Sequence, residues 1–236
     1  MNEFLEALKF LTVIPINTAT DEKSLAKSPR LFPLVGLSLG LGLSLFLFLF
    51  SKFTGHWTAI MLTIISWEII TGGIHIDGLA DTVDGLMSRK DREKILEVMR
   101  DSRIGTMGAL AIFFILALKC LSLGESSNTY IKLILAPTYG RFLITFSIFL
   151  FPYGRKEGKG SIFSKALTEK DIIISGIITF ILGLLIGLKK GLFAFFIVII
   201  LGYLLAFYLN KRIGGLTGDT YGAICEIIEL VTLLVL

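Results

Sequence analysis

Residues 31–50 read LFPLVGLSLGLGLSLFLFLF and contain no charged side chain. At a rise of about 1.5 Å per residue, a helix of this length crosses the roughly 30 Å hydrocarbon core of a bilayer. The chain of 236 residues is 54% hydrophobic and 18% charged, and its mean hydropathy is +0.80. Soluble domains average about 45–50% apolar and about 25% charged residues. The composition therefore predicts an all-α membrane protein and excludes disordered, collagen-like and disulfide-scaffold chains.

Other segments have the same apolar character, and some of them carry isolated charges such as Glu68 and Arg141. A membrane helix needs about 20 predominantly apolar residues. We therefore expect the chain, 1–236, to form one integral-membrane catalytic domain, a polytopic transmembrane helical bundle. It has about seven predicted spans, which lie at 31–50, 57–76, 104–118, 131–153, 172–188, 192–210 and 221–236.

The first residues predict a different kind of helix. In the segment 1–15, the side chains of Phe4, Leu5, Leu8 and Leu11 recur at helical spacing on one face. This pattern is typical of a helix that lies in the membrane interface. The segment lacks the positively charged start of a secretory signal, so we expect no cleavage.

The basic residues predict the orientation of the chain. They concentrate in alternate loops, whereas Lys52, Lys189 and Lys190 fall between the other spans. By the positive-inside rule, the N-terminus and the basic loops face the cytoplasm. The net charge of +4 is therefore attributed to membrane orientation, and no nucleic-acid partner is expected.

The segment 72–86, GGIHIDGLADTVDGL, carries the strongest chemical signal. On a helix, Asp77, Asp81 and Asp84 project within an arc of about 60°. Their mutual repulsion is relieved by water or by a divalent cation, and oxygen ligands favour Mg²⁺ or Mn²⁺. Mg²⁺ commonly bridges to phosphates, so the motif indicates a phosphorylated substrate. The alternative is a solvated acidic face of an ordinary loop.

Two nearby features extend this prediction. His75 has the chemistry of a general base near neutral pH. In the segment 99–108, MRDSRIGTMG, Asp101 is a candidate fourth metal ligand and Arg103 a candidate phosphate clamp. The intervening residues 89–100 are charged at almost every other position and predict a solvated helix.

A second polar cluster, NKRIGGLTGDTYG at 210–222, is neither a Walker A motif nor a dinucleotide fingerprint. Its glycines allow backbone N–H groups to approach an anion, although a plain helix-breaking turn fits equally well. Asp219, Glu226 and Glu229 recur toward one side of the span that follows, and charges within a span are functional candidates. For Glu68 and Arg141, a structural ion pair between their spans is an equal alternative.

The loop YGRKEGKG at 153–160 mixes basic residues with glycine. It can close over a polyphosphate or contact anionic lipid headgroups. Of its residues, Arg155 is the candidate for phosphate binding.

Together these motifs resemble the cobalamin synthase family, the adenosylcobinamide-GDP ribazoletransferases. The resemblance runs from residue 4 to about residue 229, through FLEALKFLTVIPI (4–16), GGIHIDGLADTVDGL, DSRIGTMG (101–108), YGRKEGKG and GGLTGDTYGA (214–223). It implies a multi-pass inner-membrane enzyme that performs the last steps of nucleotide-loop assembly in cobalamin biosynthesis. The implied reaction joins adenosylcobinamide-GDP to alpha-ribazole or its 5'-phosphate, releases GMP and requires Mg²⁺.

The resemblance also implies roles for individual residues. The family's acidic motif falls on Asp77, Asp81 and Asp84, and its DSR-G element on Asp101, Ser102, Arg103 and Gly105. Its GG-TGD element falls on Gly214, Gly215, Thr217, Gly218 and Asp219. We expect membrane lipid as a partner and leave open an oligomer or contacts with other cobalamin-assembly enzymes.

Three other functions compete with this interpretation. A CDP-alcohol phosphotransferase also uses membrane aspartates, but no Arg follows Ala80 as its DGxxAR pattern requires. A prenyltransferase would favour two DxxxD-like motifs on different helices. A carboxylate-relay transporter would use Glu68, Arg141, Glu226 and Glu229 at mid-membrane, yet the densest acidic cluster lies next to a predicted cytoplasmic loop.

Overall fold

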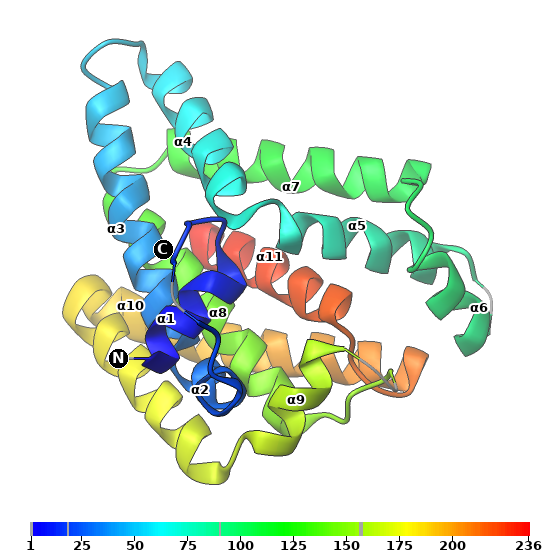
Figure 1. Ribbon diagram of the computed structural model, residues 1–236. Helices are drawn as coiled ribbons and strands as arrows, with labels where there is room; N and C mark the ends of the chain where they lie inside the picture. Colours follow the sequence, from blue (N-terminus) through cyan, green and yellow to red (C-terminus); the bar gives the residue numbers. More distant parts are fainter. Residues whose placement is uncertain (1, 18, 90, 156–157) are drawn as a thin grey trace.

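The computed structural model describes residues 2–17, 19–89, 91–155 and 158–236, and no β-strand occurs among them. This confirms the predicted all-α membrane fold (Figure 1). In chain order, the helices are α1 (Asn2–Leu11), α2 (Glu22–Lys27), the 3-10 helix η1 (Ser28–Leu31), α3 (Phe32–Phe50), α4 (His56–Thr71), α5 (Ile74–Met87), α6 (Arg92–Val98), α7 (Thr106–Gly124), α8 (Thr129–Leu150), α9 (Lys159–Ala166), α10 (Glu169–Ile213) and α11 (Gly218–Val235).

Helix α8 forms the centre of the molecule, where α3, α10 and α11 pack against it. The apolar stretch of α8 is 78% buried, compared with 22% for α7. Large apolar side chains such as Leu41, Phe113, Leu185 and Phe193 remain exposed on the outer helices. Apolar side chains on both the inner and the outer faces are expected of helices surrounded by lipid.

Within the described residues, four helical segments are long and apolar enough to cross a membrane, or five if the bent pair α4 and α5 counts as one span. The 45 residues of α10 include a non-helical backbone conformation at Leu188. Gly183 and Gly191 lie against each other across this break, and Figure 1 shows the two arms of α10 running in different directions. The break lies where the sequence predicts a boundary between two spans, although a total of about seven spans stays a prediction.

The largest departure from the predicted spans occurs between α4 and α5. The sequence predicts one span at 57–76, but α4 ends at Thr71 and the chain bends by 87° before α5 begins. Gly72 and Gly73 both adopt the left-handed conformation, with φ of 65° and 66°, which glycine tolerates because it has no Cβ. The segment 57–76 is therefore not one straight helix, while its crossing of the membrane as a bent span stays a prediction. The bend turns α5 so that it packs along α7 and α11.

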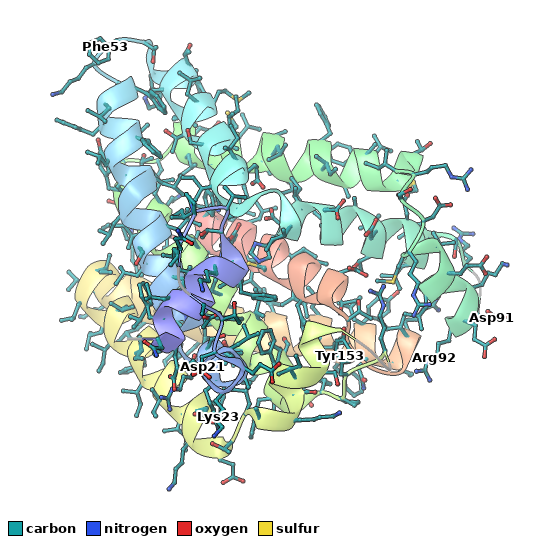
Figure 2. The ribbon with its side chains drawn as sticks, in the orientation of Figure 1. Asp21, Lys23, Phe53, Asp91, Arg92 and Tyr153 are labelled. Carbon is teal, nitrogen blue, oxygen red and sulfur yellow. The ribbon has the colours of Figure 1, made fainter. Side chains whose placement is uncertain are left out.

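The turn between α3 and α4 lies at one extreme of the bundle, as Figure 2 shows. Phe53, in the turn between α3 and α4, is 85% exposed and lies far from Asp21, Asp91, Arg92 and Tyr153 in this view. This separation agrees with the predicted sides of the membrane for these loops. The orientation itself stays a prediction, and Lys90 and Lys156 of the basic loops lie outside the described residues.

The N-terminal segment forms the predicted helix, α1, which packs against α3 and η1. Ala7 and Leu11 are buried, and Glu3 pairs with Arg30 at 2.6 Å. These contacts hold α1 against the bundle. Its predicted position in the membrane interface stays a prediction.

Candidate active site

Helix α5 carries the acidic motif on one side, as its spacing predicts. Asp77 is exposed, while Asp81 and Asp84 are half-buried. Behind them, Gly78 lies against the backbone of Asp219. A side chain at Gly78 would collide with that backbone, so glycine allows α5 and α11 to approach closely.

A pocket of about 230 Å³ opens beside this acidic face. Asp77 and Asp81 line it from α5, and Asp101 and Ser102 line it from the loop between α6 and α7. The structure thus brings together the first two motifs. We call this cavity the acidic pocket; its remaining lining residues are Ala80, Met99, Arg100 and Ile104.

The third and fourth motifs meet at the start of α11. The N–H of Gly154 donates to the carbonyl of Leu216 at 2.7 Å, and the N–H of Leu216 donates to the carbonyl of Pro152 at 2.8 Å. This short parallel bridge places Arg155 beside Asp219, with 2.6 Å between Nη2 and Oδ2. The Nε of Arg155 is buried and has no partner within the described residues.

Asp81 lies within electrostatic reach of Asp77, Asp84 and Asp219, and Arg155 is the counter-charge that acts on it. Carboxylates that share a small region repel one another unless a cation or a proton relieves them. The residues around Asp81 therefore form a region of excess negative charge, drawn from two helices that are distant in sequence.

Several predicted site residues already have partners within the protein. The Asp84 carboxylate accepts the N–H groups of Gly105 at 2.7 Å and Gly108 at 2.8 Å, and so caps the start of α7. Thr217 is buried, and its hydroxyl accepts the N–H of Thr220 at the start of α11. The metal role of Asp84 and the substrate role of Thr217 stay predictions.

The glycine cluster forms the connection between α10 and α11. Gly214 ends α10 in the left-handed conformation, while Gly215 is buried and Gly218 is exposed. Their predicted substrate contacts are untested and remain predictions.

The exposed loop before α7 holds a close ion pair. Arg103 donates to Asp101 through both Nε and Nη2, the latter at 2.6 Å. These hydrogen bonds lower the pKa of Asp101 to about 2, so the carboxylate is ionised at neutral pH. Its guanidinium partner is 87% exposed, which leaves Arg103 accessible to an anionic ligand.

The donor chemistry of the acidic pocket suits Mg²⁺, since its lining side chains offer carboxylate and hydroxyl oxygens. Across the described ranges, no three His, Cys, Asp or Glu side chains converge closely enough to hold a metal ion by themselves. Mg²⁺ typically takes one or two carboxylates and completes its shell with water and substrate phosphate. Asp77 and Asp81 fit that kind of site better than a cage built from protein alone.

A separate set of charges lies inside the helix bundle. Lys119 is fully buried and lies 2.7 Å from both Glu226 and Glu229. Arg141 also pairs with Glu229 and donates to Nδ1 of His75 at 3.1 Å. We call this group, together with Glu68, the interior ion network.

The ion pair between Glu68 and Arg141 that the sequence allows is not formed. The sequence allows a pair between Glu68 and Arg141, but Glu68 lies 3.6 Å from Lys119 and Arg141 pairs with Glu229. Glu226 and Glu229 are at most 2% exposed and are already paired. Their predicted role in substrate binding stays a prediction.

The hydrogen bond from Arg141 determines which nitrogen of the His75 ring carries the proton. An Arg side chain only donates hydrogen bonds, so Nδ1 of His75 must be the acceptor. The ring proton then sits on Nε2. The ring therefore presents a donor rather than a free base, which weakens the predicted role of His75 in proton abstraction.

Sequence reasoning missed two features of this region. Lys119 was given no role, although a lysine inside a predicted span is itself a signal of a buried partner. It also missed a second pocket, lined by Phe10, Phe163 and Tyr221 among others. No sequence pattern connects these three aromatic residues, because they lie on different helices.

Comparison with known proteins agrees with the motifs. A family model described as cobalamin-5-phosphate synthase matches residues 3–236. Relatives named adenosylcobinamide-GDP ribazoletransferase are 38% identical in Roseiflexus sp. (strain RS-1) and 39% identical in Alkaliphilus metalliredigens (strain QYMF) and Brevibacillus brevis (strain 47). The matches cover 97%, 97% and 100% of this chain and 86%, 92% and 98% of those relatives. No solved structure matches the chain. The chain belongs to the cobalamin-5-phosphate synthase family and is a transferase of cobalamin biosynthesis.

Proposed function

We propose that the protein transfers the adenosylcobinamide-phosphate group from adenosylcobinamide-GDP to a hydroxyl of alpha-ribazole or its 5'-phosphate. The reaction depends on Mg²⁺, for which Mn²⁺ can substitute, and takes place at the cytoplasmic face of the inner membrane. The observation that carries this proposal is the acidic pocket, where Asp77, Asp81 and Asp101 line one cavity. The names of the relatives supply the donor and the ribazole-type acceptor.

The proposed reaction breaks a phosphoanhydride bond of the donor and forms a phosphodiester bond to the acceptor. The hydroxyl oxygen of the acceptor forms a bond to the phosphorus nearest the cobinamide, and the bond between that phosphorus and the GMP oxygen breaks. The hydroxyl proton passes to a base, and GMP leaves with the bonding electron pair. The product is adenosylcobalamin or its 5'-phosphate.

Catalysis of this exchange is mainly electrostatic, because both the attacked phosphate and the departing GMP carry negative charge. Asp77 and Asp81, with Asp101 and Asp84 as further candidates, would hold the metal. When bound, Mg²⁺ stabilises the charge on the transferred and leaving phosphates. Arg103 and Arg155 are the side chains that would donate hydrogen bonds to the phosphate oxygens.

The proton acceptor is an aspartate of the acidic pocket in this proposal. His75 is the weaker candidate because its Nδ1 accepts from Arg141 and its Nε2 carries the ring proton. A carboxylate that does not contact the metal is free to take the proton from the acceptor hydroxyl.

The proposed function is tested with purified protein in detergent or nanodiscs. Adenosylcobinamide-GDP and alpha-ribazole are supplied together, and GMP and the cobalamin product are quantified with Mg²⁺, with Mn²⁺, and after chelation. We expect equal amounts of GMP and cobalamin, and loss of both on chelation. Failure to form GMP at saturating Mg²⁺ contradicts the function, whereas unchanged turnover after chelation contradicts only the metal requirement.

A further inference from the structure

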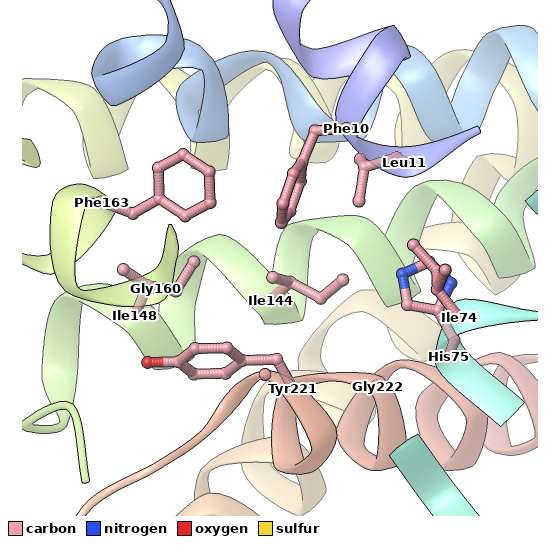
Figure 3. Close-up of a pocket in the computed structure, with 11 residues that line it drawn as sticks. Phe10, Leu11, Ile74, His75, Ile144, Ile148, Gly160, Phe163, Tyr221 and Gly222 are labelled. Carbon is pink, nitrogen blue, oxygen red and sulfur yellow. The ribbon is translucent and has the colours of Figure 1, made fainter. Parts of the chain in front are cut away.

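A second cavity, of about 290 Å³, lies among α1, α5, α8, α9 and α11. Figure 3 shows the rings of Phe10, Phe163 and Tyr221 at its walls and the ring of His75 at one end. Most of its other lining atoms belong to aliphatic residues and glycine; these are Leu11, Ile74, Ile144, Ile148, Gly160, Gly218 and Gly222. We call this cavity the aromatic pocket. Such a lining suits a flat, largely apolar ligand.

The ring of His75 presents a hydrogen-bond donor to the aromatic pocket. His75 is only 5% exposed, and its Nδ1 accepts from Arg141. Its Nε2 must therefore carry the ring proton, and this N–H has no partner within the described part of the chain. Figure 3 shows a ring nitrogen of His75 facing the interior of the pocket. The pocket thus offers an oriented hydrogen-bond donor at His75, and the buried hydroxyl of Tyr221, which has no partner within the described residues, is a second polar group in its lining.

We propose that the aromatic pocket binds the base of the ribazole acceptor, with His75 Nε2 donating a hydrogen bond to the unsubstituted ring nitrogen. A dimethylbenzimidazole has an in-plane acceptor nitrogen, a flat bicyclic ring and apolar methyl groups. This inference rests on the proposed function and adds the place where its acceptor binds.

The other parts of the two substrates fit this pocket less well. A volume of 290 Å³ lies at the lower limit of ligand pockets, which is about 300 Å³, and is too small for a corrin ring. Guanine presents several donors and acceptors around its edge, and burying them against apolar walls leaves them unpaired at a cost. The ribazole base needs one hydrogen bond to its acceptor nitrogen, and the N–H at Nε2 of His75 can supply it.

The aromatic pocket is built partly from the same two helices, α5 and α11, that carry the carboxylates around Asp81. Ile74 and His75 lie in the first turn of α5, just before Asp77. Gly218 immediately precedes Asp219 on α11. A nucleoside whose base lies in the aromatic pocket therefore contacts both helices that carry the excess carboxylates.

The first test uses the unmodified protein and a matched pair of ligands. The ligand 1,5,6-trimethylbenzimidazole has the acceptor nitrogen, whereas 1,5,6-trimethylindole has a C–H group in its place. We expect both to compete with alpha-ribazole and not with adenosylcobinamide-GDP. The benzimidazole should bind about 2- to 10-fold more tightly, which is the range for one neutral hydrogen bond. Equal inhibition by the two ligands, or competition with adenosylcobinamide-GDP, overturns the proposal.

The second test changes the donor. In His75→Asn, the amide oxygen can still accept from Arg141, but the shorter side chain loses the donor at the position of Nε2. We expect KM for alpha-ribazole to rise about 2- to 10-fold, KM for adenosylcobinamide-GDP to stay constant, and the preference for benzimidazole over indole to vanish. A rise only in KM for adenosylcobinamide-GDP contradicts the proposal.

His56→Asn is the matched control, because His56 is exposed at the start of α4 and bonds to the carbonyl of Gly124. It should alter neither KM. Failure of the proposed function is recognised separately, since wild-type protein would then form no GMP with alpha-ribazole. That outcome would contradict both the proposed function and the proposed binding site. Normal turnover with equal inhibition by the two ligands would contradict only the proposed binding site.

Discussion

The acidic pocket and the interior ion network use the same residue types on neighbouring helices, yet their charges are arranged in opposite ways. In the network, Glu226 and Glu229 are buried and contact Lys119 directly. In the acidic pocket, Asp77 and Asp81 have no ion pair within the described residues, and Asp81 faces further carboxylates. One region neutralises its carboxylates internally, while the other retains excess negative charge.

Burial explains this difference. A carboxylate inside the bundle loses its hydration and is tolerated only with a close cation and hydrogen bonds. A carboxylate at the open end of α5 keeps some water and can remain unpaired in the free protein. Unpaired carboxylates around a cavity are therefore available to an external cation, whereas Glu226 and Glu229 of the interior ion network already bind Lys119.

The largest expected effect comes from breaking the interior ion network. Lys119→Met removes the cation between Glu226 and Glu229 and should lower the free energy of unfolding by about 3–5 kcal/mol. The measurement is thermal or denaturant unfolding in detergent. Lys132→Met is the matched control, because Lys132 is buried but, among the described residues, bonds only to Ser122. A smaller loss in Lys119→Met than in Lys132→Met would contradict the assigned importance of the network.

A substitution in the acidic pocket should reduce activity without reducing stability, unlike one in the interior ion network. Asp81→Asn should reduce kcat by about 10²–10³-fold, in the range for losing one strong electrostatic contribution to catalysis. Its unfolding temperature should not fall, because the change removes repulsion rather than an ion pair. GMP release and thermal unfolding are measured on the same sample.

Glu93→Gln is the control for this prediction, since Glu93 is an exposed carboxylate on the short helix α6. It should leave both quantities unchanged. Near-normal activity of Asp81→Asn would remove Asp81 from the proposed catalytic group.

The smallest effect concerns Asp84, which belongs to the acidic motif but is already hydrogen-bonded. Asp84→Ala should cost about 0.5–2 kcal/mol of unfolding free energy in metal-free buffer, because the N–H groups of Gly105 and Gly108 lose their acceptor. Asp91→Ala, which removes the cap of the exposed helix α6, should cost less. Unchanged stability of Asp84→Ala together with weaker metal activation would assign Asp84 to the metal instead.

Family membership also bears on the competing functions. The relatives are named as transferases, which favours an enzyme over a carboxylate-relay transporter. The residues of that relay, Glu68, Arg141, Glu226 and Glu229, lie in or beside the interior ion network. The CDP-alcohol and prenyltransferase alternatives have no support from the family model.

Much of the candidate site was predictable because it depends on local spacing. Asp77, Asp81 and Asp84 share one side of α5 since helical periodicity alone determines it. The sequence motifs also made Asp101 a candidate fourth metal ligand, whereas they gave no indication that Asp219 approaches the acidic side of α5 from α11. The turn of 87° at Gly72 was not predicted, because the apolar character of 57–76 outweighed the Gly72-Gly73 pair, which is itself a turn signal.

The amino-acid sequence by itself determined that this is a helical membrane protein, where its apolar helices lie, and which short motifs carry carboxylates. Those properties follow from hydropathy and from a period of 3.6 residues, which act over one or two turns. Only the tertiary structure decided which carboxylates have partners: Lys119 and Glu229 are distant in sequence yet in contact. It likewise decided that Phe10, Phe163 and Tyr221 share a pocket. Pairing and cavity shape depend on how separate helices pack, and no local pattern encodes that packing.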